Sequence, residues 1–250
     1  MIRLKNDEQI KRIGEACRLT AELMRQLATF IEAGMSTAQV DRFCYDFITR
    51  NKGVPAFLGY GGFPATACIS INEEVIHGIP SEDRIIQEGD LVSIDLGINL
   101  DGYFSDMART FIIGETTEEK RALNSVTEQC LRLAVEAAGR SGARVQTISK
   151  AVFAKATEHR LGVVRDYCGH GVGLAVHEPP EIPNYAAPFQ ANPRLREGMV
   201  LAIEPMITLG AHTVRVLSDG WTVVTTDGLP SSHFEDTVAI TKHGVEVLTV

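Results

Sequence analysis

The sequence of 250 residues has few cysteines and no close pair of them. The five are Cys17, Cys44, Cys68, Cys130 and Cys168. Their number is odd and no Cys-x-x-Cys spacing occurs, which argues against a disulfide framework and a cysteine-based zinc site. This usage is typical of a reducing cytosol, so we expect a cytoplasmic protein whose thiols are mostly buried.

Long apolar segments and basic runs are also missing. No apolar stretch reaches the ~18 residues of a membrane span, and the first residues, MIRLKNDEQIKRIGEA, are charged where a signal peptide would be apolar. The 24 Lys and Arg are outnumbered by 32 Asp and Glu, for a net charge of −8. We therefore expect neither nucleic acid nor a membrane surface as a partner.

What the chain does have is a hydrophobic content of 44%, enough for a large core. Apolar periodicity and capping residues predict helices over about 6–34, 36–51, 116–139 and 145–160. Strand and loop patterns follow each helix pair. The order of two helices followed by strands therefore occurs twice. This repeat predicts an α+β fold of two similar halves, about residues 1–114 and 115–250, whose sheets join in one core.

Residues 91–113, LVSIDLGINLDGYFSDMARTFII, show the alternation of a half-buried β-hairpin. If Leu100 and Asp101 form the loop, Asp95 lies directly opposite Asp106, with Cβ atoms about 4.5–5.5 Å apart. Facing carboxylates repel unless a cation lies between them. Either aspartate alone would read as a solvated residue, but the symmetric pair favours a metal site.

Further candidates lie in the second half. His170 stands between glycines in CGHGVGLAVHEPP, a pattern that indicates a tight turn, and His177 follows seven residues later. Glu204 ends the apolar run in MVLAIEPMI and is either buried with a partner or exposed at a strand end. Glu235, in SSHFEDTVAIT, precedes another apolar run. Each is ambiguous alone.

Taken together, two Asp, two Glu and one His make an oxygen-rich set with one imidazole. Such a set favours divalent manganese, iron, cobalt or zinc. Four carboxylates carry more negative charge than one dication neutralises, so we infer two metal ions, about 3.5–4 Å apart as in two-metal hydrolases.

Five segments, in order along the chain, resemble the type I methionine aminopeptidases: LGYGGFPATACISINEEVIHGIP, IDLGINLDGYFSDMARTF, GHGVGLAVHEPP, MVLAIEPM and DGWTVVTTDGLPSSHFEDTVAIT. The resemblance runs from the first helix to the carboxyl terminus. It implies a pita-bread fold with a central antiparallel sheet, in one catalytic domain over residues 1–250. It also implies removal of the initiator methionine during protein maturation, with preference for a small second residue.

The resemblance assigns roles to individual residues. The two metal ions would be held by Asp95, Asp106, His170, Glu204 and Glu235. The substrate would contact His77 and His177, and the methionine pocket would be lined by Tyr60, Phe63, Cys68 and Trp221. For the aromatic residues and Cys68, simple core packing is the alternative interpretation.

The implied mechanism is attack on the first peptide bond by water activated at the metal pair. Glu204 would act as general base and later as proton donor, with Asp95 beside the free amine. His177 would contact the developing oxyanion and His77 the scissile amide nitrogen. The implied partners are amino termini of nascent polypeptides, with transient ribosome contact, and the implied state is a monomer.

The chain departs from this family at four positions. Phe57 and Gly61 stand where Cys and His are common, Val176 where Phe is common, and Asp236 where His is frequent. These departures bear on the shape of the side-chain pocket and on the preference for the second substrate residue, and they leave every predicted metal ligand in place.

Two alternatives remain at this stage, a prolidase-like pita-bread peptidase and a non-catalytic, peptide-binding pita-bread protein. Prolidases usually carry a substantial amino-terminal domain, whereas only a short helix pair precedes the first sheet here. Inactive relatives characteristically lose metal ligands, and this chain retains all five positions.

Overall fold

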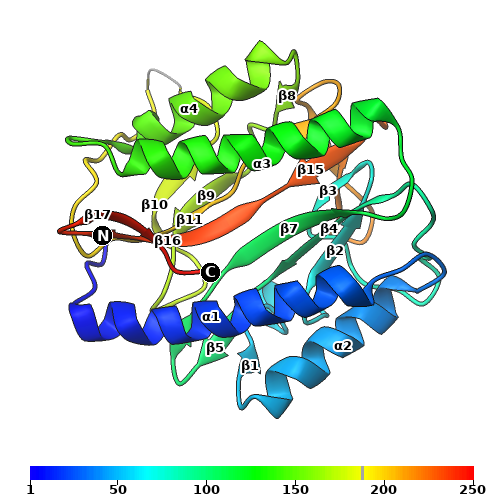
Figure 1. Cartoon of the computed structure of the whole chain (residues 1–250), viewed down its shortest axis with the longest axis horizontal. Coiled ribbons are helices and arrows are strands. Elements are labelled where there is room, and N and C mark those ends of the chain that lie inside the picture. The colour runs from blue at the N-terminus through cyan, green and yellow to red at the C-terminus, as the bar shows by residue number, and fades with distance from the viewer. Residues whose placement is uncertain (187–188) are drawn as a thin grey trace.

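A computed structural model of the chain describes residues 1–186 and 189–250. The two predicted helix pairs are present: α1 (Asp7–Phe30) and α2 (Thr37–Arg50), then α3 (Glu118–Ala138) and α4 (Val145–Glu158). Figure 1 shows α1 and α2 along one side of the molecule and α3 and α4 along the other, with strands between them. No helix in the described ranges is long and apolar enough to cross a membrane.

Local capping explains where α1, α2 and α3 begin. Before α1, the Asn6 side chain accepts the backbone N–H of Gln9, and the Gln9 side chain accepts the backbone N–H of Asn6. Ser36 and Gln39 form the same capping box before α2, and Thr117 caps α3 with its hydroxyl alone. These contacts satisfy N–H groups that have no partner within the helix, so the starts were readable from the sequence.

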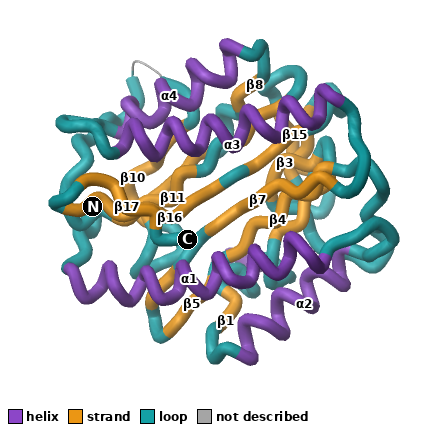
Figure 2. Tube along the Cα trace, in the orientation of Figure 1, coloured by secondary structure: helices purple, strands orange, loops and turns teal. Residues whose placement is uncertain are grey.

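In the described part of the chain, an eight-stranded antiparallel sheet forms the centre (Figure 2). Its order is β10–β9–β11–β16–β7–β4–β2, with β17 paired to β16. The strands are β2 (Cys68–Ile71), β4 (Leu91–Leu96), β7 (Met107–Ile112), β9 (Cys168–Gly171), β10 (Glu178–Pro183), β11 (Val200–Ile203), β16 (Glu235–Thr241) and β17 (Gly244–Val247). The β7–β16 pair joins strands of the first half to strands of the second, which confirms the predicted α+β architecture.

Among residues 1–186 and 189–250, three smaller antiparallel sheets and one 3-10 turn flank this sheet. The first contains β1 (Val54–Pro55), β5 (Ile98–Leu100) and β6 (Tyr103–Phe104). The second contains β15 (Ser231–His233), β12 (Met206–Thr208) and β8 (Gly162–Val163). The third contains β13 (Val214–Val216), β14 (Val223–Thr225) and β3 (Glu74–Ile76), and the turn is η1 (Tyr60–Gly62).

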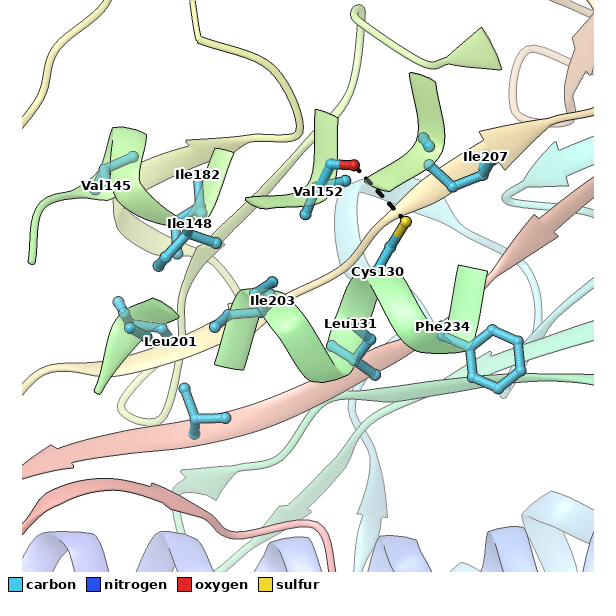
Figure 3. Packing of buried hydrophobic residues seen from close by; sticks show 14 of the residues in the cluster. Cys130, Leu131, Val145, Ile148, Val152, Ile182, Leu201, Ile203, Ile207 and Phe234 are labelled. Carbon is cyan, nitrogen blue, oxygen red and sulfur yellow. Dashed lines mark hydrogen bonds between the residues drawn. The ribbon is translucent and has the colours of Figure 1, made fainter. Parts of the chain in front are cut away.

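Figure 3 shows how α3 and α4 pack on the strands of the second half. Cys130 and Val152 contact each other between the two helices, where the Cys130 thiol donates to the Val152 carbonyl at 3.7 Å. Leu201 and Ile203 of β11 and Ile182 of β10 belong to the same buried cluster. The helices thereby bury one face of the strands that carry the second-half site residues.

A buried ion pair ties the amino-terminal segment to the connection between β9 and β10. The Lys5 ammonium donates to Glu178 Oε2 at 2.9 Å, and the two side chains are 1% and 2% exposed. The other Glu178 oxygen accepts the backbone N–H groups of Leu174 and Ala175. Burial lowers the pKa of Lys5, while its hydrogen bond and ion pair with Glu178 act in the opposite direction. The connection that carries His177 is therefore fixed by the buried contacts of Glu178.

We predict that Lys5→Met lowers the free energy of unfolding by about 3–5 kcal/mol, because it leaves the Glu178 carboxylate buried without its cation. Urea denaturation measures the change. The matched control is Arg25→Met, which breaks an exposed 3.0 Å pair with Glu22 and should leave the free energy of unfolding nearly unchanged, because solvent screens the pair. Equal effects of the two substitutions would contradict the stabilising role of the buried pair.

Candidate functional site

One cavity of about 130 Å³ brings together every site residue predicted from the sequence. It is lined by Phe57, Tyr60, Phe63, Cys68, His77, Asp95, Asp106, His170, His177, Glu204, Trp221 and Glu235. A dry cavity of ~150 Å³ holds a molecule the size of benzene, so this one suits a single amino-acid side chain. Acidic and imidazole groups therefore meet aromatic groups in a space the size of one side chain.

The two aspartates share this cavity, but not in the predicted register. Asp95 of β4 pairs with Ala108 rather than with Asp106. The loop consists of Asp101 and Gly102, with φ of 52° and 86°, instead of Leu100 and Asp101. A tight hairpin turn of this kind needs positive φ at both central residues, which Asp-Gly adopts more easily than Leu-Asp. The register moves by two residues, so Asp106 remains on the same face as Asp95, as a diagonal neighbour.

The second-half residues come from neighbouring strands of the same sheet. His170 lies in β9 opposite Ala202 of β11, and Glu204 follows β11 directly. Glu235 opens β16 opposite Ala108, the residue that also pairs with Asp95. The strand order therefore places carboxylates on both sides of Ala108.

The glycines around His170 serve strand packing rather than the predicted turn. His170 is in a regular strand, and a Cβ at Gly169 would lie 2.5 Å from the Ala202 carbonyl oxygen. A Cβ at Gly171 would lie equally close, 2.5 Å, to the Pro179 carbonyl oxygen. Only glycine lets the neighbouring backbones come this near. This close approach determines how far the His170 imidazole reaches into the cavity.

The arrangement of ligand atoms is one that a cation fits. Ligand atoms of Asp106, His170 and Glu235 lie within 4.8 Å of one another. One oxygen each of Asp95, Asp106 and Glu235 is buried without a hydrogen-bond partner among the described residues. His170 Nδ1 lies 2.9 Å from the Gly171 carbonyl and donates to it, which leaves the Nε2 lone pair facing the carboxylates.

Burial and mutual repulsion disfavour the charged forms of these carboxyl groups. Burial raises the pKa of Asp95 to about 7. Burial raises the pKa of Asp106 well above its usual range, and the negative charges of Asp95 and Glu204 add to that effect. The pKa values of Glu204 and Glu235 are raised for the same reasons. Burial, with His177 nearby, lowers the pKa of His170 to about 3, so the imidazole is neutral, as a metal ligand must be.

Glu204 is mostly buried and has partners, which favours the first of the two interpretations left open by the sequence. Its side chain is 11% exposed and lies between two imidazoles. Glu204 Oε1 is 3.5 Å from His170 Nε2, and Glu204 Oε2 is 3.7 Å from His233 Nε2.

The other two predicted histidines reach the cavity from loops. The ring of His177 lies 4.1 Å from that of His170, between centroids, and its Nδ1 is 2.9 Å from the Tyr60 hydroxyl. His77 follows β3 with φ of 58° and packs edge-on against Trp221. Burial, with His177 nearby, lowers the pKa of His77 to about 4.

The aromatic side of the cavity is both core and pocket wall. Phe63 and Trp221 meet edge to face with centroids 5.2 Å apart. Cys68 is 4% exposed, and burial raises the pKa of its thiol well above the usual range, so it acts as a small apolar group. Phe57 also lines this side of the cavity. In the sequence, this position stood out only as a departure from the family pattern. Gly61 has φ of 57°, and a Cβ there would touch Trp221 at 3.4 Å.

His233 is a neighbour of the site that the sequence analysis missed. It is 1% exposed, behind Glu204, and does not line the cavity. The only sequence signal was its place two residues before Glu235. Burial lowers the pKa of His233 to about 3.

Comparisons with known proteins agree with this geometry. The sequence profile of metallopeptidase family M24 matches residues 11–242. A methionine aminopeptidase of Treponema pallidum is 54% identical over 249 residues, which cover 100% of this chain and 96% of the relative. The chain belongs to metallopeptidase family M24. The pita-bread fold expected from the resemblance is therefore confirmed.

Solved structures separate the subgroups of the M24 family. A methionine aminopeptidase from Thermotoga maritima matches with a TM-score of 0.96 and 40% identity, covering 100% of this chain and 99% of the other. A prolidase from Pyrococcus furiosus matches with a TM-score of 0.79 and 28% identity, and the match covers only 65% of the prolidase. This M24 chain is thus much more similar to the methionine aminopeptidases than to the prolidase.

We predict that the metal-free protein becomes more stable as the pH falls from about 8 to about 6.5. The buried carboxyl groups have folded-state pKa values above the unfolded ones, about 7 for Asp95, so the folded state binds more protons and loses stability as pH rises through that value. Below pH 6.5 the buried histidines, with lowered pKa values, oppose the trend, since they take up protons more readily when unfolded.

Thermal unfolding at several pH values, after verified removal of metal, measures this dependence. Asp95→Asn should flatten it, and metal-loaded protein should lack it because a bound cation keeps the carboxylates ionised. If the stability of the metal-free protein stays constant or falls as the pH is lowered from 8 to 6.5, the pKa values of the carboxyl groups are not raised as we infer.

Proposed function

We propose that the protein is a metal-dependent methionine aminopeptidase that removes amino-terminal methionine from polypeptides. The single observation that carries this proposal is the joining of a carboxylate–imidazole cluster to an apolar pocket for one side chain within one cavity. The full-length similarity to methionine aminopeptidases supports the same activity. The prolidase alternative has weaker support, and a purely peptide-binding role would leave the converging carboxylates unexplained.

We propose that two divalent metal ions, of cobalt, manganese, iron or zinc, are held by Asp95, Asp106, His170, Glu204 and Glu235. The buried carboxylate oxygens without partners and the Nε2 lone pair of His170 fit such ions. When bound, the ions would supply Lewis-acid activation of water and of the peptide carbonyl. Two dications would also offset the four negative charges that otherwise repel one another.

The free amine of the substrate would lie next to Asp95. Cys68, in the wall of the apolar pocket, pairs directly with Asp95 across β2 and β4. A methionine side chain in the pocket therefore brings its own amino group close to the Asp95 carboxylate. A peptide without a free amine at this position would lack this contact with Asp95, which favours removal of the first residue only.

The protons would be moved and the developing charge stabilised by three side chains. Glu204 would take a proton from the attacking water and return it to the leaving amine. The Nδ1 atom of His177 is engaged with the Tyr60 hydroxyl, which leaves Nε2 for a hydrogen bond to the oxyanion. His77 would contact the amide nitrogen of the scissile bond.

We further propose that residues 1–250 act as one catalytic domain, since each half contributes part of the ligand set. The substrates would be the amino termini of nascent polypeptides in the cytoplasm. The protein would act on them as a monomer, in transient contact with ribosomes. The unpaired cysteines support the cytoplasmic setting.

We expect the metal-loaded enzyme to release Met from a Met-Gly-type peptide at least ~10-fold faster, in kcat/KM, than Leu from its Leu-Gly counterpart. The pocket of Phe63, Cys68 and Trp221 suits an unbranched thioether. Chelation should abolish both reactions, and peptides with a bulky second residue should be poorer. Preferential cleavage of non-Met Xaa-Pro peptides would instead establish the prolidase-like alternative.

Two histidine variants should separate chemistry from metal binding. His177→Ala should keep its metal content and fold but lose about 10²–10³ in turnover, the usual effect of removing one oxyanion donor. His170→Ala should instead lose metal, because its Nε2 faces the carboxylate cluster. Metal stoichiometry and single-turnover rates of both variants test this. Loss of metal from His177→Ala to the same extent would make His177 a ligand.

A further inference from the structure

His233 occupies a fixed position behind Glu204. It pairs with Met206 across β15 and β12. The Thr110 hydroxyl accepts the backbone N–H of His233 at 2.9 Å and donates to the His233 carbonyl at 2.8 Å. The backbone beneath the imidazole is therefore anchored to β7, the strand that follows Asp106.

The imidazole itself has unused hydrogen-bonding capacity. Neither ring nitrogen of His233 has a hydrogen-bond partner among the described residues, although the side chain is 1% exposed. A buried polar group in that state costs about 1–3 kcal/mol, so its retention calls for a function. Glu204 Oε2, 3.7 Å from Nε2, is the carboxylate oxygen that faces the ring.

The two oxygens of Glu204 face different groups. Oε1 lies 3.5 Å from His170 Nε2, on the side of the predicted metal ligands. Oε2 points to His233, which is absent from the cavity wall. Closing the gap between Nε2 and Oε2 by roughly 0.5–1 Å would make an ordinary N–H···O hydrogen bond. Such a bond would fix Glu204 Oε2 against His233 and direct Glu204 Oε1 into the cavity.

We propose that His233 is a positioning residue, whose Nε2–H donates to Glu204 Oε2 and sets the orientation in which Glu204 binds metal and transfers protons. The catalytic part of this proposal rests on the proposed peptidase function. Other charged or titratable groups near the ring are His77 and Arg109. Arg109 already donates to the Glu235 carbonyl and to Asp236, so it does not substitute for His233 at Glu204.

The decisive comparison is between His233→Leu and His233→Gln. Leucine fills the space without a donor, while glutamine keeps an N–H donor. Removal of a group that orients a metal ligand typically costs 10–100-fold in metal affinity or activity. We expect His233→Leu to lose about that factor in kcat, with KM changed less than about twofold, and to bind Mn²⁺ correspondingly more weakly. His233→Gln should recover most of both losses.

Ser232→Ala is the matched control, because Ser232 is buried in the same strand and bonds to Asn124, away from the cavity. It should leave kcat and Mn²⁺ affinity unchanged. The unfolding temperatures of the two metal-free His233 variants should stay close to that of the wild type, which shows that both variants fold. If leucine and glutamine variants behave alike, or if His233→Leu keeps wild-type kcat and Mn²⁺ affinity, the proposal is wrong.

Two measurements keep this test independent of the peptidase assignment. In Mn²⁺ titration of the demetallated protein, His233→Leu should add nothing in a Glu204→Gln background, as expected for residues that act through one contact. Nitrogen-15 NMR of the protein loaded with diamagnetic Zn²⁺, in which Glu204 is ionised, should show His233 protonated at Nε2. An Nδ1-protonated ring, or additive effects of the two substitutions, would overturn the proposal even in an active methionine aminopeptidase.

Discussion

Repulsion among four buried carboxyl groups is the constraint on which the rest of this structure depends. Asp95, Asp106, Glu204 and Glu235 converge on one small cavity, where low polarity strengthens every charge–charge interaction. Without counter-charge each carboxyl group tends to keep its proton, as the raised pKa values show. The large sheet and the helices that cover it provide the stability that tolerates such a cluster, and two cations would turn the repulsion into binding energy.

The sheet determines the geometry of the site through small residues. Ala108 lies between Asp95 and Glu235 on adjacent strands, and its short side chain leaves room for both carboxylates. Gly169 and Gly171 let β9 approach its neighbours closely enough to bring His170 to the same depth. The chemistry of the ligands thus relies on neighbours that contribute no functional group.

Features encoded locally were predictable from the sequence, and features set by tertiary contacts were not. The helix starts at Asn6, Ser36 and Thr117 follow from capping contacts within a few residues. The hairpin register depended on which residues accept positive φ, and a two-residue error still left both aspartates on one face. His233 was not predictable as a site residue because Glu204 becomes its neighbour through strand pairing, of β12 with β15 and of β11 with β16.

The link between Lys5 and Glu178 also bears on how the protein forms during synthesis. The two residues are 173 positions apart, so the connection carrying His177 gains its internal anchor only after most of the chain has been made. The central sheet requires still more, since β16 begins at Glu235 and joins the two halves. Contacts between such distant segments form slowly, and domains acquire their packing as units. An emerging chain would therefore be unable to process its own or neighbouring amino termini until its carboxyl-terminal strands had been added.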